Sequence, residues 1–164
     1  MQKINLRSNQ ASILTIPLPQ EEWQPRTFRH SLDICLKDSN AYGNTYFSRY
    51  FEWQGVCREQ WFYQCIRSDM LQSEGVFITK YAHQDYVHET LPFQKVECEL
   101  NTYNIRQCSF NLLFRFFVDG KCVSSGHQQI VFANHSKKIT RLPQGVIEQI
   151  REFEVPEPGL RLPG

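Results

Sequence analysis

A short segment of small and neutral polar residues carries the groups in this sequence that are best suited to chemistry. Asn40, Gly43 and Tyr46 lie close together in it. The Asn40 amide can hold water through its oxygen and donate a hydrogen bond through its nitrogen, and the Tyr46 phenol can donate another. Gly43 has no Cβ, so a bound carbonyl could approach the backbone closely there. These groups could deliver water to a carbonyl carbon and stabilise the resulting oxyanion.

The same segment leads into the longest helical pattern of the chain, which would position it. From Thr45 to about Ile66 the aromatic and apolar side chains fall on one half of a helical wheel, so that half must lie against a large apolar surface. The first N–H groups of a helix have no partner inside it and lie at the positive end of its dipole. We therefore expect Gly43, Asn44 and Thr45 to hold the carbonyl, with the amides of residues 44–46 as the oxyanion hole.

The aromatic face of this helix has two interpretations. Most such stripes are hydrophobic core, and packing alone would account for it. Alternatively, Phe47, Tyr50 and Trp53 line a pocket for an acyl chain, since aromatic walls would suit a flat conjugated chain. The sequence leaves both interpretations open.

Arg58 is one of only two strongly polar side chains in the apolar half of the helix, the other being Gln54. An arginine that faces a core is costly unless its charge is met. A side chain that reaches solvent from the helix edge, or a pair with a structural carboxylate, explains Arg58 as well as a functional role does. At 1.5 Å per residue it lies about 18 Å along the helix from Tyr46. Within one subunit the two residues therefore cannot contact the same carbonyl.

Strand patterns flank the helix in the sequence. Alternation of apolar and polar residues begins at Phe28 and stops at a polar cluster from Lys37 to Asn40. Pro143 opens a short second helix. Four further strands are predicted over Gly75–Tyr86, Phe93–Tyr103, Cys108–Val118 and Lys121–Phe132. This order predicts an α+β fold in which a curved antiparallel sheet of five or more strands wraps one long central helix.

The predicted strand Cys108–Val118 is apolar on both of its faces. One face of an antiparallel sheet usually meets water. We therefore expect a second subunit to cover the outer face of this strand, which makes the protein a homo-oligomer.

Length and composition limit the remaining possibilities. The 164 residues fit one domain, predicted over 26–154, with an irregular lead-in at 1–25 and a loose tail at 155–164. A net charge of +1 gives no basic field for nucleic acid, and no segment is suited to cross a membrane. The six scattered cysteines, without a secretory signal, predict free thiols and a cytoplasmic protein. The histidines form no metal-binding motif, so neither a metal nor a cofactor is expected.

Two neighbouring motifs resemble those of hot-dog-fold thioesterases. NAYGNTYF at residues 40–47 and WQGVCRE at residues 53–59 carry every letter of the patterns N-x-x-G-N-x-Y-F and W-Q-G-x-C-R-E. These patterns are most similar to those of the thioesterases that accompany iterative enediyne polyketide synthases. A weaker resemblance extends from about Arg26 to Asn134.

The resemblance implies the hot-dog fold, dimers with joined sheets that often form tetramers, and active sites at the subunit interface beside the helix start. It also implies a functional arginine at Arg58. In the broader 4-hydroxybenzoyl-CoA thioesterase group an aspartate usually stands at the place of Asn40, and an alternative carboxylate falls near Gly55. This chain has neither, which predicts a thioesterase without a catalytic carboxylate.

The expected function is hydrolysis of a thioester between a polyene or β-keto acyl chain and an acyl carrier protein. In this hypothesis Asn40 orients water, Tyr46 and the backbone amides polarise the carbonyl, and Arg58 supplies positive charge to its own or the partner subunit's site. Two alternatives remain: a general acyl-CoA thioesterase, and a non-catalytic hot-dog module that binds an acyl chain.

Overall fold

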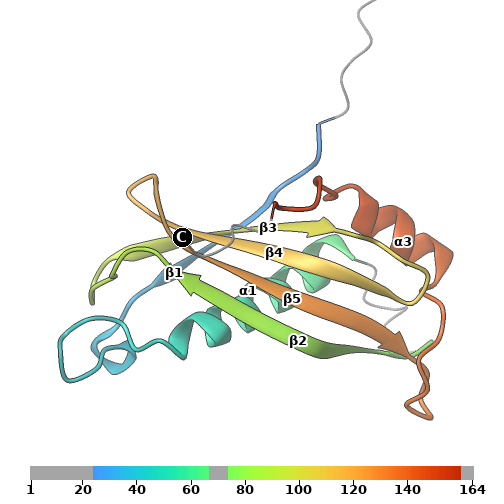
Figure 1. Cartoon of the computed structure of the whole chain (residues 1–164), viewed down its shortest axis with the longest axis horizontal. Helices are drawn as coiled ribbons and strands as arrows, with labels where there is room; N and C mark the ends of the chain where they lie inside the picture. Colours follow the sequence, from blue (N-terminus) through green and yellow to red (C-terminus); the bar gives the residue numbers. More distant parts are fainter. Residues whose placement is uncertain (1–23, 67–73, 160–164) are drawn as a thin grey trace, which may run out of the picture.

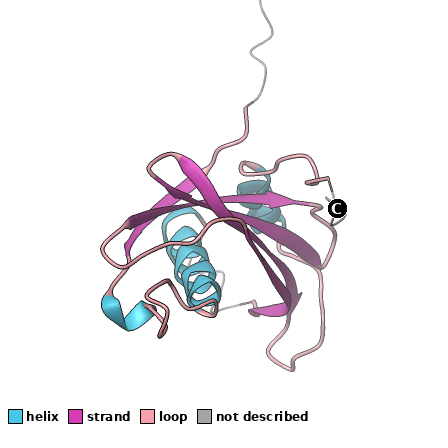
Figure 2. Ribbon diagram, turned by 60° about the vertical axis from the view of Figure 1, so that its left-hand side comes forward, coloured by secondary structure: helices cyan, strands magenta, loops and turns pink. Residues whose placement is uncertain are grey.

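The structure is a computed structural model that describes residues 24–66 and 74–159. One antiparallel five-stranded sheet curves around a single long helix, α1 (Arg49–Cys65) (Figure 1, Figure 2). The strand order is β1-β3-β4-β5-β2. The strands are β1 (Phe28–Asp33), β2 (Val76–Tyr86), β3 (Lys95–Tyr103), β4 (Ser109–Val118) and β5 (Lys121–Ala133). The predicted α+β fold, a curved antiparallel sheet around a central helix, is confirmed.

Alternating side chains of the central strands form the core between the sheet and α1. Every second residue of β4, from Phe110 to Val118, is buried. Helix α1 contributes the buried side chains of Trp53, Cys57 and Trp61. Full burial of a large apolar side chain stabilises a fold by about 1.5–3 kcal/mol. The helix is therefore held in place mainly by its aromatic face.

Helix α1 begins at Arg49, four positions after the predicted start at Thr45. The reason is competition for backbone hydrogen bonds. The N–H of Thr45 donates to the carbonyl of Thr90 at 2.9 Å, and the N–H of Tyr46 donates to the carbonyl of Asp38 at 2.8 Å. The preceding residues are therefore fastened to other segments and cannot join the helix. Tyr46 lies in the loop, not in the first helical turn.

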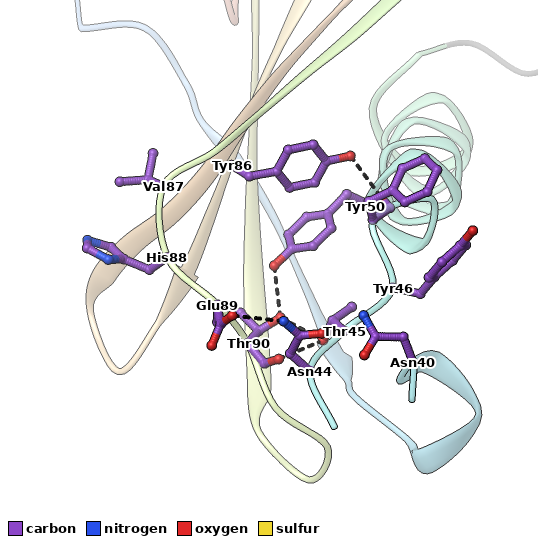
Figure 3. A pocket seen from close by; sticks show the side chains of 11 residues that line it. Asn40, Asn44, Thr45, Tyr46, Tyr50, Tyr86, Val87, His88, Glu89 and Thr90 are labelled. Atoms are coloured by element: carbon purple, nitrogen blue, oxygen red, sulfur yellow. Dashed lines mark hydrogen bonds between the residues drawn. The ribbon is translucent and has the colours of Figure 1, made fainter. Parts of the chain in front are cut away.

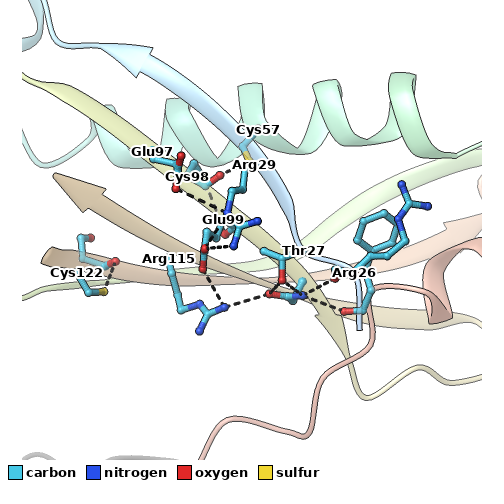
Figure 4. Close-up of polar contacts among 12 residues, drawn as sticks. Arg26, Thr27, Arg29, Cys57, Glu97, Cys98, Glu99, Arg115 and Cys122 are labelled. Carbon is cyan, nitrogen blue, oxygen red and sulfur yellow. Dashed lines mark hydrogen bonds and ion pairs between the residues drawn. The ribbon is translucent and has the colours of Figure 1, made fainter. Parts of the chain in front are cut away.

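Ion pairs on the sheet link the neighbouring strands β1, β3 and β4 (Figure 4). Glu99 of β3 lies opposite Arg29 of β1 and opposite Arg115 of β4 in the strand register. Its carboxylate oxygens lie 2.9 Å from the Arg29 guanidinium and 3.0 Å from that of Arg115. Opposite charges at facing positions favour this register over a slipped one, since a slip by one residue would turn every side chain to the other face.

The C-terminal helix α3 (Gln144–Arg151) packs at one end of the sheet. The Thr102 hydroxyl donates to the carbonyl of Ile150 at 2.8 Å, and the ring of Phe153 lies edge-on to Trp61 at 5.6 Å between centroids. The helix that was predicted to follow Pro143 is confirmed. The predicted lead-in at 1–25 falls almost wholly outside the described residues, so the domain boundaries remain a prediction.

Two surfaces of the sheet bear on the expected oligomer. The outward-facing residues of β4, such as Leu113 and Phe117, are only partly buried. Strand β2 is an edge strand, and Val76, Ile78 and Tyr81 are exposed on it. An edge strand presents unpaired N–H and C=O groups that can pair with another chain. Both surfaces are therefore available to a second subunit, and the oligomer remains a prediction.

Candidate active site

A cavity of about 350 Å³ opens beside the start of α1 (Figure 3). It lies between the loop that precedes the helix and the segment that follows β2. Its lining residues are Asn40, Asn44, Thr45, Tyr46, Phe47, Tyr50, Tyr86, Val87, His88, Glu89 and Thr90. Most of the residues expected to do chemistry are thus brought to one place, together with a second segment that sequence analysis did not connect to them.

A tight turn holds the loop around Asn40. Its side-chain oxygen accepts the N–H of Tyr42 at 2.8 Å, and its carbonyl accepts the N–H of Gly43 at 3.0 Å. Gly43 has a φ of +84°, a conformation that glycine adopts readily. Gly43 is absent from the cavity lining, and a Cβ there would meet nothing within 4 Å. The turn therefore requires this glycine for its backbone conformation, and its expected role in close approach of a carbonyl is not supported.

The backbone amides of the loop are only partly available. Those of Gly43, Thr45 and Tyr46 already donate to carbonyls of the chain. No acceptor among the described residues meets the N–H groups of Asn44 and Phe47. Of the three amides expected to form an oxyanion hole, those of Thr45 and Tyr46 are therefore engaged elsewhere, and only that of Asn44 has no acceptor there. The N–H of Phe47, near the positive end of α1, is a further donor without one.

A buried cluster of hydroxyl groups fastens the loop to the segment after β2. The Thr90 hydroxyl donates to the Thr45 hydroxyl at 2.7 Å and lies 2.8 Å from the phenol oxygen of Tyr50. Burial raises the pKa of Tyr50, while its hydrogen bond with Thr90 opposes that effect. Tyr86 adds a further link, because its phenol donates to the carbonyl of Phe47 at 2.8 Å. The cavity walls are therefore fixed by contacts between residues that lie 39 to 45 positions apart in the sequence.

The aromatic residues that were expected to contact an acyl chain divide into two groups. Phe47 and Tyr50 line the cavity, and Tyr46 lies beside Phe47 with 4.7 Å between ring centroids. Trp53 does not line it, since its buried side chain packs against Tyr50 and Phe116 in the core. For Trp53 the structure favours the packing interpretation.

A carboxylate reaches the cavity from the segment after β2. Glu89 lines the cavity, and its Oε1 accepts a hydrogen bond from the side-chain nitrogen of Asn44 at 2.9 Å (Figure 3). In the two motifs, the positions that carry a carboxylate in similar thioesterases are Asn40 and Gly55 here. Neither position indicates a role for Glu89. Glu89 lies 45 residues from Asn44 in sequence, and no local pattern connects them.

Arg58 lies outside the cavity lining, on the side of α1 that faces the edge of the sheet. Its guanidinium donates to the hydroxyl of Thr79 on β2 and to Oε1 of Gln128 on β5, the latter at 3.0 Å. Among the described residues no carboxylate forms an ion pair with it. Burial lowers the pKa of Arg58 from its ordinary value, with an opposing effect of Glu59. Arg58 is thus a half-buried cation with neutral partners, near the open edge of the sheet.

A chain of buried amide side chains links Arg58 to the rest of the sheet. Gln128 donates to Gln54 at 3.0 Å, and Gln54 donates to Gln84 at 2.6 Å. Gly126 makes room for this chain, because a Cβ there would collide with the side chains of Gln54 and Gln84. Buried polar groups are tolerated when they are hydrogen-bonded, so the helix glutamine of the motif has a structural role here.

Metal binding and membrane crossing find no support in the described ranges. No group of three or more His, Cys, Asp or Glu side chains is placed to hold a metal ion there. By length and hydropathy, none of the helices described could cross a bilayer. All six cysteines are unpaired.

Solved structures share this architecture. The dynemicin thioesterase, whose crystal structures reveal effects of polyene binding, matches with a TM-score of 0.72 at 19% identity over 79% of this chain and 99% of its own. A 1,4-dihydroxy-2-naphthoyl-CoA thioesterase from Synechocystis matches at 0.70 and 15% over 77% and 96%. The protein SAV2348 from Staphylococcus aureus, solved in complex with CoA, matches at 0.72 and 13% over 79% and 84%. At these identities the likeness establishes the hot-dog fold of thioesterases.

Family membership follows from the sequence itself. The family model of the thioesterase-like superfamily matches residues 34–150, which is well over half of the chain, and the protein belongs to that superfamily. Among curated protein sequences no significant match is found. The matched range contains both the loop that precedes α1 and the segment after β2, so the whole cavity lies inside it.

Proposed function

We propose that this protein hydrolyses a thioester between an acyl chain and a carrier thiol, at the cavity beside the start of α1. One observation carries the proposal. In a chain of the thioesterase-like superfamily, this cavity collects Asn40, Tyr46 and two backbone N–H groups that have no acceptor among the described residues. Preorganised donors of this kind stabilise the oxyanion of a tetrahedral intermediate.

In this proposal each group has a distinct role. The Asn40 oxygen accepts the N–H of Tyr42, and its nitrogen, which has no acceptor among the described residues, is proposed to donate to water or to the thioester carbonyl. Tyr46 donates its phenol hydrogen. The N–H groups of Asn44 and Phe47 add donors at the positive end of the helix.

Arg58 is proposed to act across a subunit interface. It is too far along α1 to reach the cavity of its own subunit, and its charge has no anionic partner among the described residues. Pairing of two β2 edges would place the Arg58 side chain at the junction of the two subunits, since it already contacts Thr79 of that strand. The proposed assembly is a dimer or a dimer of dimers.

The substrate is proposed to be a polyene or β-keto acyl chain on the acyl carrier protein of an iterative, enediyne-type polyketide synthase. The paired motifs, the structural likeness to the dynemicin thioesterase and the aromatic walls of the cavity support this choice. A flat conjugated chain suits walls formed by Phe47, Tyr50 and Tyr86. The six unpaired cysteines fit a reaction in the cytoplasm.

Acyl-CoA is the alternative substrate, favoured by the CoA complex of the similar S. aureus protein. The test is thiol release from a matched set: short and long acyl-CoAs, an aryl-CoA, and a polyenoyl chain loaded on a carrier protein. The expected result is a higher kcat/KM for the carrier-bound polyene. A preference for CoA esters would instead establish a general acyl-CoA thioesterase. Stoichiometric binding without thiol release from any substrate would contradict hydrolysis and favour the non-catalytic binding module.

A further inference from the structure

We propose that the carboxylate of Glu89 is the general base that deprotonates the attacking water. The inference rests on the proposed thioester hydrolysis and assigns that reaction the base that the two motifs lack. It arises from the geometry of one side chain in the segment after β2.

The backbone on both sides of Glu89 is held in place, and the Glu89 side chain lines the cavity. The N–H of His88 donates to the carbonyl of Val123 at 2.9 Å. Thr90 is buried and belongs to the hydroxyl cluster with Thr45 and Tyr50. The backbone at Glu89 is therefore held from both sides, which gives its exposed carboxylate a defined location beside the cavity.

Only one of the two Glu89 carboxylate oxygens accepts a hydrogen bond from the described residues. Oε1 accepts the hydrogen bond from Asn44, and Oε2 has no donor among the described residues. A carboxylate oxygen in this situation can accept a hydrogen bond from water. Asn44 thus acts as a positioning residue that orients the carboxylate, while Oε2 is left for the reaction.

Glu89 differs from three glutamates of the protein that are paired with arginine. Glu52, Glu99 and Glu152 each form an ion pair with arginine. Glu89 has a neutral amide as its partner and forms no ion pair within the described part of the chain. The Glu89 carboxylate is therefore not held by a cation there, and it lines the cavity where water and the thioester would meet.

The step balances as follows. The Glu89 carboxylate takes a proton from water as the water oxygen forms a bond to the thioester carbonyl carbon, whose C=O electron pair moves to its oxygen. The donors of Asn40, Asn44 and Phe47 hold that oxyanion. The intermediate re-forms the carbonyl, the C–S bond breaks, and the leaving sulfur takes the proton from Glu89. The products are a carboxylic acid and a thiol, and Glu89 is again ionised.

The test compares kcat and KM as functions of pH for the wild type, Glu89→Gln and Glu148→Gln. The last makes the same chemical change on α3, away from the cavity. General-base catalysis contributes about 10²–10⁴-fold. Glu89→Gln should therefore lower kcat by about 10²-fold or more with little change in KM, and its residual rate should lose the rise with pH on the acid side. Glu148→Gln should match the wild type.

Three results would overturn the inference, and they separate it from the proposed function. If the wild type hydrolyses thioesters and Glu89→Gln keeps the same rate and pH profile, the general-base role of Glu89 is refuted while the proposed function stands. Transfer of ¹⁸O from labelled water into Glu89 during a single turnover would show that Glu89 acts as a nucleophile and not as a general base. A wild-type protein that hydrolyses no thioester would refute both proposals. Glu89→Gln retains the size of the side chain, and equal thermal midpoints would show that the fold is intact.

Discussion

Asn40 lines the cavity, and one of the two polar atoms of its side-chain amide is already hydrogen-bonded to the backbone. Its oxygen closes a turn with the N–H of Tyr42, and its nitrogen is left for the substrate or water. The same residue therefore shapes the loop and donates to the reaction. A useful substitution must separate these two roles, since loss of the turn alone could also lower activity.

We predict that Asn40→Ala and Asn40→Ser both lower kcat by about 10²-fold, as loss of one oxyanion donor does. The serine hydroxyl can accept the N–H of Tyr42 and preserve the turn, although more weakly, whereas neither variant has the amide donor. Thiol-release kinetics measure the effect, with Asn111→Ala on the outer face of β4 as a control. An active Asn40→Ser variant beside an inactive alanine variant would reduce Asn40 to a turn residue.

Among the residues that the structure describes, Arg58 has only neutral hydrogen-bond partners and no ion pair. We predict that Arg58→Ala and Arg58→Gln each lower kcat/KM by about tenfold or more, because both remove a positive charge that would stabilise an oxyanion. The glutamine variant can still form neutral hydrogen bonds with Thr79 or Gln128, so it separates charge from local structure. Full activity of Arg58→Gln would show that the arginine is structural. Thermal unfolding of both variants checks that the loss is not one of folding.

At the scale of elements, helix α1 meets β2 and β5 through a polar seam, which we define as Gln54, Gln84, Gln128 and Arg58. Elsewhere the helix meets the sheet through aromatic and aliphatic groups. Buried amides must find partners, and such a network permits few alternative packings. The seam therefore fixes the rotation of α1 against the sheet, on which the positions of Tyr50 and the cavity depend.

Gly126 tests this seam directly. We predict that Gly126→Ala lowers the free energy of unfolding by about 1–3 kcal/mol, because the added methyl group overpacks the space of Gln54 and Gln84. Gly55→Ala is the matched control on α1, where a Cβ meets nothing within 4 Å. It should stabilise the protein by about 0.5–1 kcal/mol, because alanine favours a helix more than glycine does. Urea unfolding compares the two, and equal effects would contradict the role of the seam.

At the scale of the whole molecule, the sheet has an open edge at β2 and a partly apolar outer face on β4. Long exposed edge strands are usually paired, covered or charged. The cavity and Arg58 lie at different positions along α1, so a complete site in the proposed function needs two copies of the chain.

We predict that sedimentation at micromolar concentration shows a dimer or tetramer and that Ile78→Lys on β2 shifts it toward monomer, since charge on an edge strand opposes pairing. Activity should fall in parallel if Arg58 acts across the interface. Leu36→Lys, also at an exposed apolar residue, should leave the assembly unchanged. A monomeric wild type would refute both the oligomer and the shared site.

Much of the architecture could be predicted from local patterns. The period-two alternation of β4 and the aromatic face of α1 both depend on neighbours a few residues away, and the structure reproduces them. The helix start could not be predicted so well. Thr45 and Tyr46 carry helical spacing, yet their amides find better-placed acceptors in Thr90 and Asp38.

The sequence by itself determined the wrapped-helix fold and the loop that bears Asn40 and Tyr46, because hydrophobic periodicity and short motifs are properties of adjacent residues. The tertiary structure decided which amides stay free, moved Trp53 into the core, gave Arg58 neutral partners and brought Glu89 to Asn44. The physical reason is the same in each case. Hydrogen bonds, charges and apolar side chains are satisfied by groups that lie close in space, and here most of those groups come from segments far apart in the chain.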